Sequence, residues 1–117
     1  MQEPTFLILT ALATGPKHGY GVTQEVAELS EGTVVLRAGT LYGALDRLVE
    51  QELILVDRQE VVDGRLRRYY RLTDAGASRL AERARRLRKH AEAAESRLQM
   101  RPNWAFGSAP ESFGASA

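Results

Sequence analysis

The sequence predicts a mainly α-helical fold with one β-hairpin and a long last helix, and three observations carry this fold class. Between residues 41 and 49, four apolar side chains fall on one face of a helix: Leu41, Leu45, Leu48 and Val49. Asp63-Gly64 is a dipeptide that strongly signals a hairpin turn. Apolar residues at alternating spacings of three and four continue from Ala77 to Leu98, which predicts a helix with an uninterrupted heptad seam.

The composition fits one compact domain and excludes several classes of function. The 117 residues suit a single domain, and 44% hydrophobic with 26% charged residues is typical of a soluble globular protein. Without cysteine there is no disulfide, thiolate nucleophile or Cys-ligated metal site. No apolar run reaches the roughly 18 residues of a membrane helix, and Glu3-Pro4 without a basic segment is unlike a signal peptide. We therefore expect a cytoplasmic protein with no membrane partner.

The first half of the chain predicts three helices, at residues 5–13, 20–29 and 39–52. The first is apolar almost all round and follows Pro4, as in a buried helix with proline near its first turn. The second carries a loose apolar stripe and is preceded by a loop rich in turn formers. A brief extended segment is expected at residues 34–36, before the third helix begins.

The second half predicts a two-stranded hairpin over residues 54–73 and then the final helix. In the second strand, one set of side chains is expected to face the core: Leu66, Tyr70 and Leu72. The other face carries Arg67, Tyr69 and Arg71. Thr73 or Asp74 supplies a cap for the final helix, which Pro102 must end.

Three helices, a hairpin and a last helix follow the order of a winged helix-turn-helix, in which the third helix enters the DNA major groove and the hairpin, or wing, flanks it. We predict a DNA-binding domain over residues 1–76, a dimerisation helix over 77–101 and a tail over 102–117. Since one helix cannot bury so long a seam alone, we expect a homodimer held by six seam residues: Leu80, Ala84, Leu87, Ala91, Ala94 and Leu98.

The charge is concentrated in one part of the chain, although the formal net charge is only +1. Residues 1–50 carry three basic and six acidic groups, whereas residues 65–89 carry ten basic and two acidic groups. Such a patch predicts a polyanionic partner, here double-stranded DNA. The alternative is a solvated helix face with spare arginines.

The candidate DNA contacts lie on the third helix and the wing. The outer face of the helix carries small residues and one arginine: Thr40, Gly43 and Arg47. Small side chains let the backbone approach base edges, and Arg47 can contact a guanine edge or a phosphate. Tyr42 lies on the flank, where it either packs or bonds a phosphate. Three wing residues are expected to bind phosphates, although exposed strands also use such residues to protect an edge: Arg65, Arg67 and Arg68.

Three ordered motifs are present: HGYGV at residues 18–22, GTLYGALDRL at 39–48 and GRLRRYYRLTDAG at 64–76. Together they resemble the PadR family of bacterial transcriptional regulators, over residues 5 to about 80. The resemblance implies a homodimeric repressor on a pseudo-palindromic operator, with the third helix reading bases and the wing clamping the DNA. The short single last helix is similar to that of the smaller PadR subfamily, whose members dimerise through it.

The resemblance also implies a ligand, because in some members an aromatic or drug-like compound at the dimer interface releases DNA. Trp104 and Phe106 are the candidates for such a site in this chain. Three positions depart from the usual PadR pattern, which has an acidic residue at Gly21, proline at Gly43 and glycine at Glu52. None of these changes removes a basic residue, so DNA binding is still expected, whereas the operator sequence cannot be carried over.

Other functions find less support in the sequence. An enzyme is not expected, because His18 and His90 lack the spacing of a metal or nucleophile site. In the family's HGY motif, His18 serves as a cap or a polar core contact. No cofactor is expected, and two distant histidines without cysteine make a poor metal sensor. The alternative function is a winged-helix module that binds a protein instead of DNA, which should present exposed apolar anchors where this chain has arginines.

Overall fold

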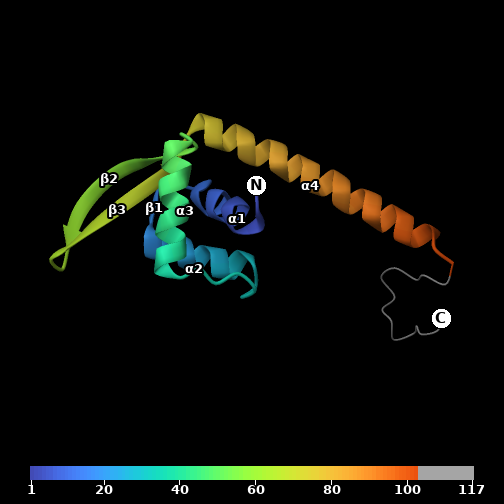
Figure 1. The fold of residues 1–117 in the computed structure, drawn as a ribbon, viewed down its shortest axis with the longest axis horizontal. Helices are drawn as coiled ribbons and strands as arrows, with labels where there is room; N and C mark the ends of the chain where they lie inside the picture. Colours follow the sequence, from blue (N-terminus) through green and yellow to red (C-terminus); the bar gives the residue numbers. More distant parts are fainter. Residues whose placement is uncertain (103–117) are drawn as a thin grey trace. The chain divides into compact units, whose positions relative to one another are not determined.

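The computed structural model describes residues 1–102, and within this range the chain forms four helices and one antiparallel sheet (Figure 1). The elements follow in the order α1 (Glu3–Leu12), β1 (Lys17–His18), α2 (Gly19–Leu29), α3 (Ala38–Glu50), β2 (Ile54–Val62), β3 (Arg65–Leu72) and α4 (Asp74–Met100). The predicted winged-helix order is confirmed. The chain divides into two compact units, Met1–Arg83 and a second unit that starts at Ala84 within α4.

The core of the first unit is made by α1, α2, α3 and the base of the hairpin. Its largest fully buried side chains are Tyr70, Ile8, Leu9, Leu12, Leu41, Leu45, Ile54, Val22 and Val26. In α3 the buried residues all lie on the face that the leucine spacing predicts: Leu41, Ala44, Leu45 and Leu48. Packing of this stripe leaves the opposite face of α3 free to contact a partner.

The sheet has three strands in the order β1-β3-β2, whereas the sequence predicted only the two-stranded hairpin. Lys17 pairs with Tyr70 and His18 with Tyr69. A strand of two residues has no alternating pattern, and its partner lies far along the chain, so nothing local signals it. This short strand joins the start of α2 to the wing.

Residues 34–36, expected to be extended, belong to no strand. The Val34 amide donates instead to Ser30 Oγ at 2.9 Å, which satisfies the backbone group that a strand would pair. Leu36 is buried in the core. The segment therefore serves as a connection that places α3 after α2.

The hairpin turn is the predicted one, because Asp63 and Gly64 both have positive φ angles, of 53° and 76°, as the central residues of a type I′ turn require. The pairing shifts once along the strands: Val56 pairs with Tyr70 but Arg58 with Tyr69. One extra residue, Asp57, is thus accommodated in β2 as a bulge, which bends and twists a strand. Figure 1 shows the hairpin projecting from the side of α3.

The start of α4 is fixed against the end of α3. Thr73 is its cap, because the Gly76 amide donates to Thr73 Oγ1 at 3.0 Å. The same hydroxyl donates to the Glu52 carbonyl at 2.8 Å, and the Thr73 amide donates to the Leu53 carbonyl at 3.1 Å. Gly76 is buried, and a Cβ there would meet the Leu53 carbonyl oxygen. Glycine therefore permits α4 to approach the backbone of Leu53, just before β2.

Candidate nucleic-acid interface

Three of the predicted reading-helix residues lie on the exposed side of α3, and Gly43 is half-buried. The exposed ones are Thr40, Tyr42 and Arg47. The Tyr42 ring lies over the backbone of Gly19, where a Cβ would come within 2.8 Å of Tyr42 Cζ. Glycine at the start of α2 thus lets Tyr42 connect α3 to the end of β1, which is next to the wing.

A groove of about 850 Å³ lies between this flank of α3 and the wing. It brings together Tyr42 and the three predicted wing arginines, Arg65, Arg67 and Arg68. The other lining residues, which no sequence pattern indicated for this site, are His18, Gly19, Tyr20, Val62, Asp63 and Leu66. Its ionised groups are three guanidinium groups and one carboxylate, so the groove suits an anionic partner.

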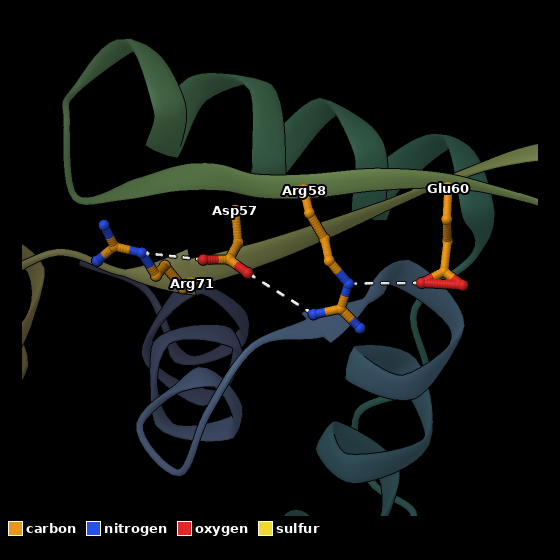
Figure 2. A network of polar contacts seen from close by, with 4 residues as sticks. All are labelled: Asp57, Arg58, Glu60 and Arg71. Carbon is orange, nitrogen blue, oxygen red and sulfur yellow. Dashed lines mark hydrogen bonds and ion pairs between the residues drawn. The ribbon is translucent and has the colours of Figure 1, made fainter.

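The other acidic residues of the hairpin are already paired, as Figure 2 shows. Asp57 lies 3.2 Å from Arg71 Nε and 3.7 Å from Arg58 Nη1, and Glu60 lies 3.4 Å from Arg58 Nε. All four side chains point to the same side of the hairpin. Exposed pairs of this kind contribute little to stability. Their effect is on charge, since Arg58 and Arg71 neutralise the carboxylates that would otherwise compete for the groove arginines.

The groove arginines have no carboxylate partner among the residues that the structure describes. Arg65 and Arg68 are exposed, and Arg67 is half-buried. Two of them are therefore free in water, where a phosphate group can reach them without breaking an existing ion pair.

His18 links the groove to the sheet. Its Nδ1 accepts from the Gly21 amide at 3.3 Å and so caps α2, one of the two roles expected for it. Its ring stacks edge-on against Tyr69, with centroids 5.4 Å apart, and Arg58 lies 3.9 Å above the Tyr69 ring. Burial and, next, the Arg67 charge lower the pKa of His18 from its usual value of 6.5, against a smaller opposite effect of Glu60. A neutral imidazole is the form that can accept the cap hydrogen bond.

Arg47 is not part of this groove. Its Nη1 lies over Gly43, 3.7 Å from where a Cβ would stand, so the side chain folds along α3. It lines a separate groove of about 200 Å³ together with Arg79 of α4. The predicted DNA contacts are thus divided between two sites on either flank of α3.

Leu66 was expected to face the core, yet it is 59% exposed. It shares a strand face with the buried Tyr70, but the hairpin extends beyond the helices, and its end is not covered by any other part of the described chain. Its cross-strand partner Val61 is exposed as well, at 71%. The alternating pattern predicted correctly which face of β3 carries Leu66. Whether that side chain is buried depends on how far the core extends along the hairpin.

The seam residues proposed for dimerisation lie along α4. Leu80, at its start, packs against the core of its own chain. Within the second unit, Leu98 and Ala84 are half-buried and Leu87 is 39% exposed. The remaining seam positions, Ala91 and Ala94, are exposed. The proposed ligand residues Trp104 and Phe106 lie outside the described residues.

Residues 1–102 contain no cluster of three potential metal ligands among His, Cys, Asp and Glu. Over the same range, none of the helices combines the length and the apolar character needed to cross a membrane.

A known family matches the greater part of this chain. The sequence profile of the transcriptional regulator PadR-like family matches residues 8–82. The transcriptional regulator Rv3488 of Mycobacterium tuberculosis is 47% identical over 75 residues, which are 64% of this chain and 66% of that protein.

Solved structures share the fold. A PadR family transcription regulator from Clostridium difficile R20291 has a TM-score of 0.68 at 26% identity, covering 81% of this chain and 97% of that one. Bacillus subtilis PadR, solved in complex with operator DNA, has a TM-score of 0.59 at 24% identity and shows the fold alone. The match covers 67% of this chain and 44% of that protein.

The fold and the basic groove beside α3 define a winged-helix transcriptional regulator rather than a member of an enzyme family. More particularly, this chain belongs to the PadR-like family of transcriptional regulators.

Proposed function

We propose that this chain is a sequence-specific DNA-binding repressor that acts as a homodimer on a pseudo-palindromic operator. In this proposal α3 lies in the major groove and the β2–β3 wing holds the phosphate backbone. The observation that carries it is the groove between α3 and the wing, in which Arg65, Arg67 and Arg68 lack carboxylate partners within the described chain. Bacillus subtilis PadR, which shares this fold, was solved in complex with operator DNA, and this supports DNA as the partner in the proposal.

The proposed dimer rests on α4. Its seam repeats at heptad spacing, and within residues 1–102 Leu87 and the seam alanines that follow it, Ala91 and Ala94, are exposed. A symmetric dimer would present two α3 helices and two wings, which matches a two-fold operator. Release by a flat aromatic compound is part of the proposal through the family resemblance, with Trp104 and Phe106 as the residues to test.

A winged helix that binds a protein is the competing function. The exposed pair Val61 and Leu66 at the end of the hairpin is the feature that favours it. However, three guanidinium groups line the adjoining groove, and each would lose its hydration against an apolar partner. A phosphate backbone offers these groups charge-assisted hydrogen bonds instead.

The experiment is a titration of the full chain with the promoter DNA of its own gene and with a scrambled duplex, over a range of salt concentrations. We expect tighter binding to the promoter and a steep fall in affinity with salt. Arg68→Ala should weaken both duplexes alike and lower the salt slope by about 1.8, because each phosphate contact contributes about 0.9 and a dimer carries the change twice. Arg85→Ala is the matched control, since Arg85 is an exposed arginine that does not line this groove. Binding that lacks promoter preference and salt dependence would contradict the proposal.

A further inference from the structure

The second groove, on the side of α3 away from the wing, has no role in the function proposed above. It lies between the start of α1, the second half of α3 and the first turns of α4, all within the unit Met1–Arg83. Leu48 and Leu53 form its apolar floor. The polar side chains around it are Thr5, Arg47, Gln51 and Arg79.

The charge of this groove is entirely positive among the side chains that line it, because it has two guanidinium groups and no carboxylate. Neither Arg47 nor Arg79 forms an ion pair in the described part of the chain. Two like charges in one groove repel each other unless an anion lies between them. Thr5 and Gln51 add uncharged hydrogen-bond donors, which an oxyanion also uses.

The size of the groove limits what can enter it. At about 200 Å³ it is smaller than the roughly 300–1,000 Å³ of pockets that hold whole organic ligands. A single phosphate group fits this limit, whereas a base or a nucleotide requires more room. Arginine is the side chain best suited to such a group, because its donors match the geometry of phosphate oxygens.

The position of the groove relates it to DNA. Tyr42, which lines the wing groove, and Arg47 are five residues apart, so they lie about 140° apart around α3. The two basic grooves therefore lie on opposite flanks of the same helix. A helix inserted in the major groove has one phosphate backbone on each side.

We propose that Arg47 and Arg79 together bind a phosphate of the DNA backbone on the flank of α3 opposite the wing. Arg47 is then a backbone contact and not a base reader, and Arg79 belongs to the DNA interface although it lies on α4. This inference rests on the proposed function, because it assumes that α3 approaches DNA. It adds a second clamp, so that the reading helix is held from both sides.

The test compares three single variants with the wild-type full chain on promoter and scrambled DNA. Arg79→Ala and Arg47→Ala should each weaken both duplexes by the same factor and lower the salt slope. The slope falls by at most about 1.8, the value for losing one phosphate contact in both protomers, because the remaining arginine still contacts that phosphate. Arg85→Ala is the matched control, because Arg85 is an exposed arginine of the same helix that lines neither groove. It should leave affinity and slope close to the wild-type values. Thermal unfolding of each variant verifies that the fold is intact.

Two results with the variants would overturn the inference. The first is that Arg79→Ala keeps the wild-type affinity and salt slope while Arg68→Ala lowers both. This outcome leaves the proposed function standing. The second is an Arg47→Ala loss confined to promoter DNA, which would make Arg47 a base reader. If the wild-type chain itself shows no salt-dependent DNA binding, the proposed function fails and this inference with it.

A free phosphate group could use the same chemistry, so a second measurement separates the two sources. NMR of the guanidinium Nε–H groups of Arg47 and Arg79 is recorded with inorganic phosphate and, separately, with the promoter duplex. The proposal is supported if the Nε–H chemical shifts change with the duplex but show no saturable change with inorganic phosphate. Saturation by inorganic phosphate alone would assign the groove to a small phosphorylated ligand and overturn the proposal.

Discussion

Replacing Glu52 by glycine should stabilise this protein, although it removes a charged side chain. Glu52 follows the last residues of α3 with a φ of 62°, a left-handed conformation that glycine adopts without strain. The Glu52 amide donates to the Val49 carbonyl at 2.9 Å and the Leu53 amide to the Leu48 carbonyl at 3.0 Å. These two bonds form the Schellman motif, whose left-handed position is usually glycine.

The magnitude follows from two opposing terms. A left-handed non-glycine residue costs roughly 1–2 kcal/mol. Glycine makes the unfolded chain more flexible, which offsets about 0.4–1 kcal/mol of the gain. The Glu52 side chain is exposed and has no ion pair in the described range, so little else is lost. The bond from Thr73 Oγ1 to the Glu52 carbonyl involves the backbone and persists in the variant. The net gain is about 1 kcal/mol, or roughly 4–8 °C in Tm for a domain of this size.

The assay is thermal unfolding followed by circular dichroism, at equal protein concentrations because a dimer makes Tm concentration-dependent. Gln51→Gly is the matched control, since Gln51 has an ordinary φ of −81° and glycine relieves no strain there. The control should lower Tm while Glu52→Gly raises it. A Tm for Glu52→Gly equal to or below the wild-type value would refute the reasoning.

Four further outcomes are expected. Leu87→Asp should give monomers in sedimentation experiments, because it buries a charge in the α4 seam, and a persistent dimer would contradict the seam interface. Lowering the pH from 7.5 to 5.5 should reduce the Tm of the wild-type chain more than that of His18→Asn. Because the pKa of His18 is lowered in the folded chain, its stabilising effect is fully present above about pH 6.5 and declines as the pH falls toward the folded-state pKa. Asparagine also caps α2 but does not titrate in this range. Gly76→Ala should cost about 1–3 kcal/mol through contact with the Leu53 carbonyl, while Gly39→Ala, where a Cβ meets nothing within 4 Å, should leave stability unchanged or raise it. Tryptophan fluorescence should respond to any planar aromatic compound that releases DNA, and a releasing compound without this response would exclude Trp104 from the ligand site.

Local patterns in the sequence were sufficient for the helices, for the hairpin and for the buried face of α3. The leucine spacing fixed which side of that helix packs, and Asp63-Gly64 fixed the turn, because both depend on residues close together in the chain. The strand β1 could not be predicted, since its pairing with Tyr69 and Tyr70 is long-range.

The sequence named four of the side chains that line the wing groove but not their arrangement, and their role in binding DNA stays a prediction. The sequence identified the wing arginines, yet Arg58 and Arg71 look the same in it, and only the fold reveals that they are paired with Asp57. It placed Arg47 on the outer face of α3, where the structure has it exposed, but it could not show that Arg79 of α4 lines the same groove. Which arginine is free depends on distances across strands and helices that a linear pattern does not contain.

The bulge at Asp57 has a consequence for how such a protein can change over evolutionary time. One inserted residue bends β2 just where the hairpin leaves the core, so it influences the direction of everything beyond it. Loss of this residue would restore regular pairing and re-aim the end of the wing, while Ile54, Tyr70 and the helices keep their contacts. A single codon gained or lost at this point is therefore a route by which the direction of the wing can change without redesigning the interior of the domain.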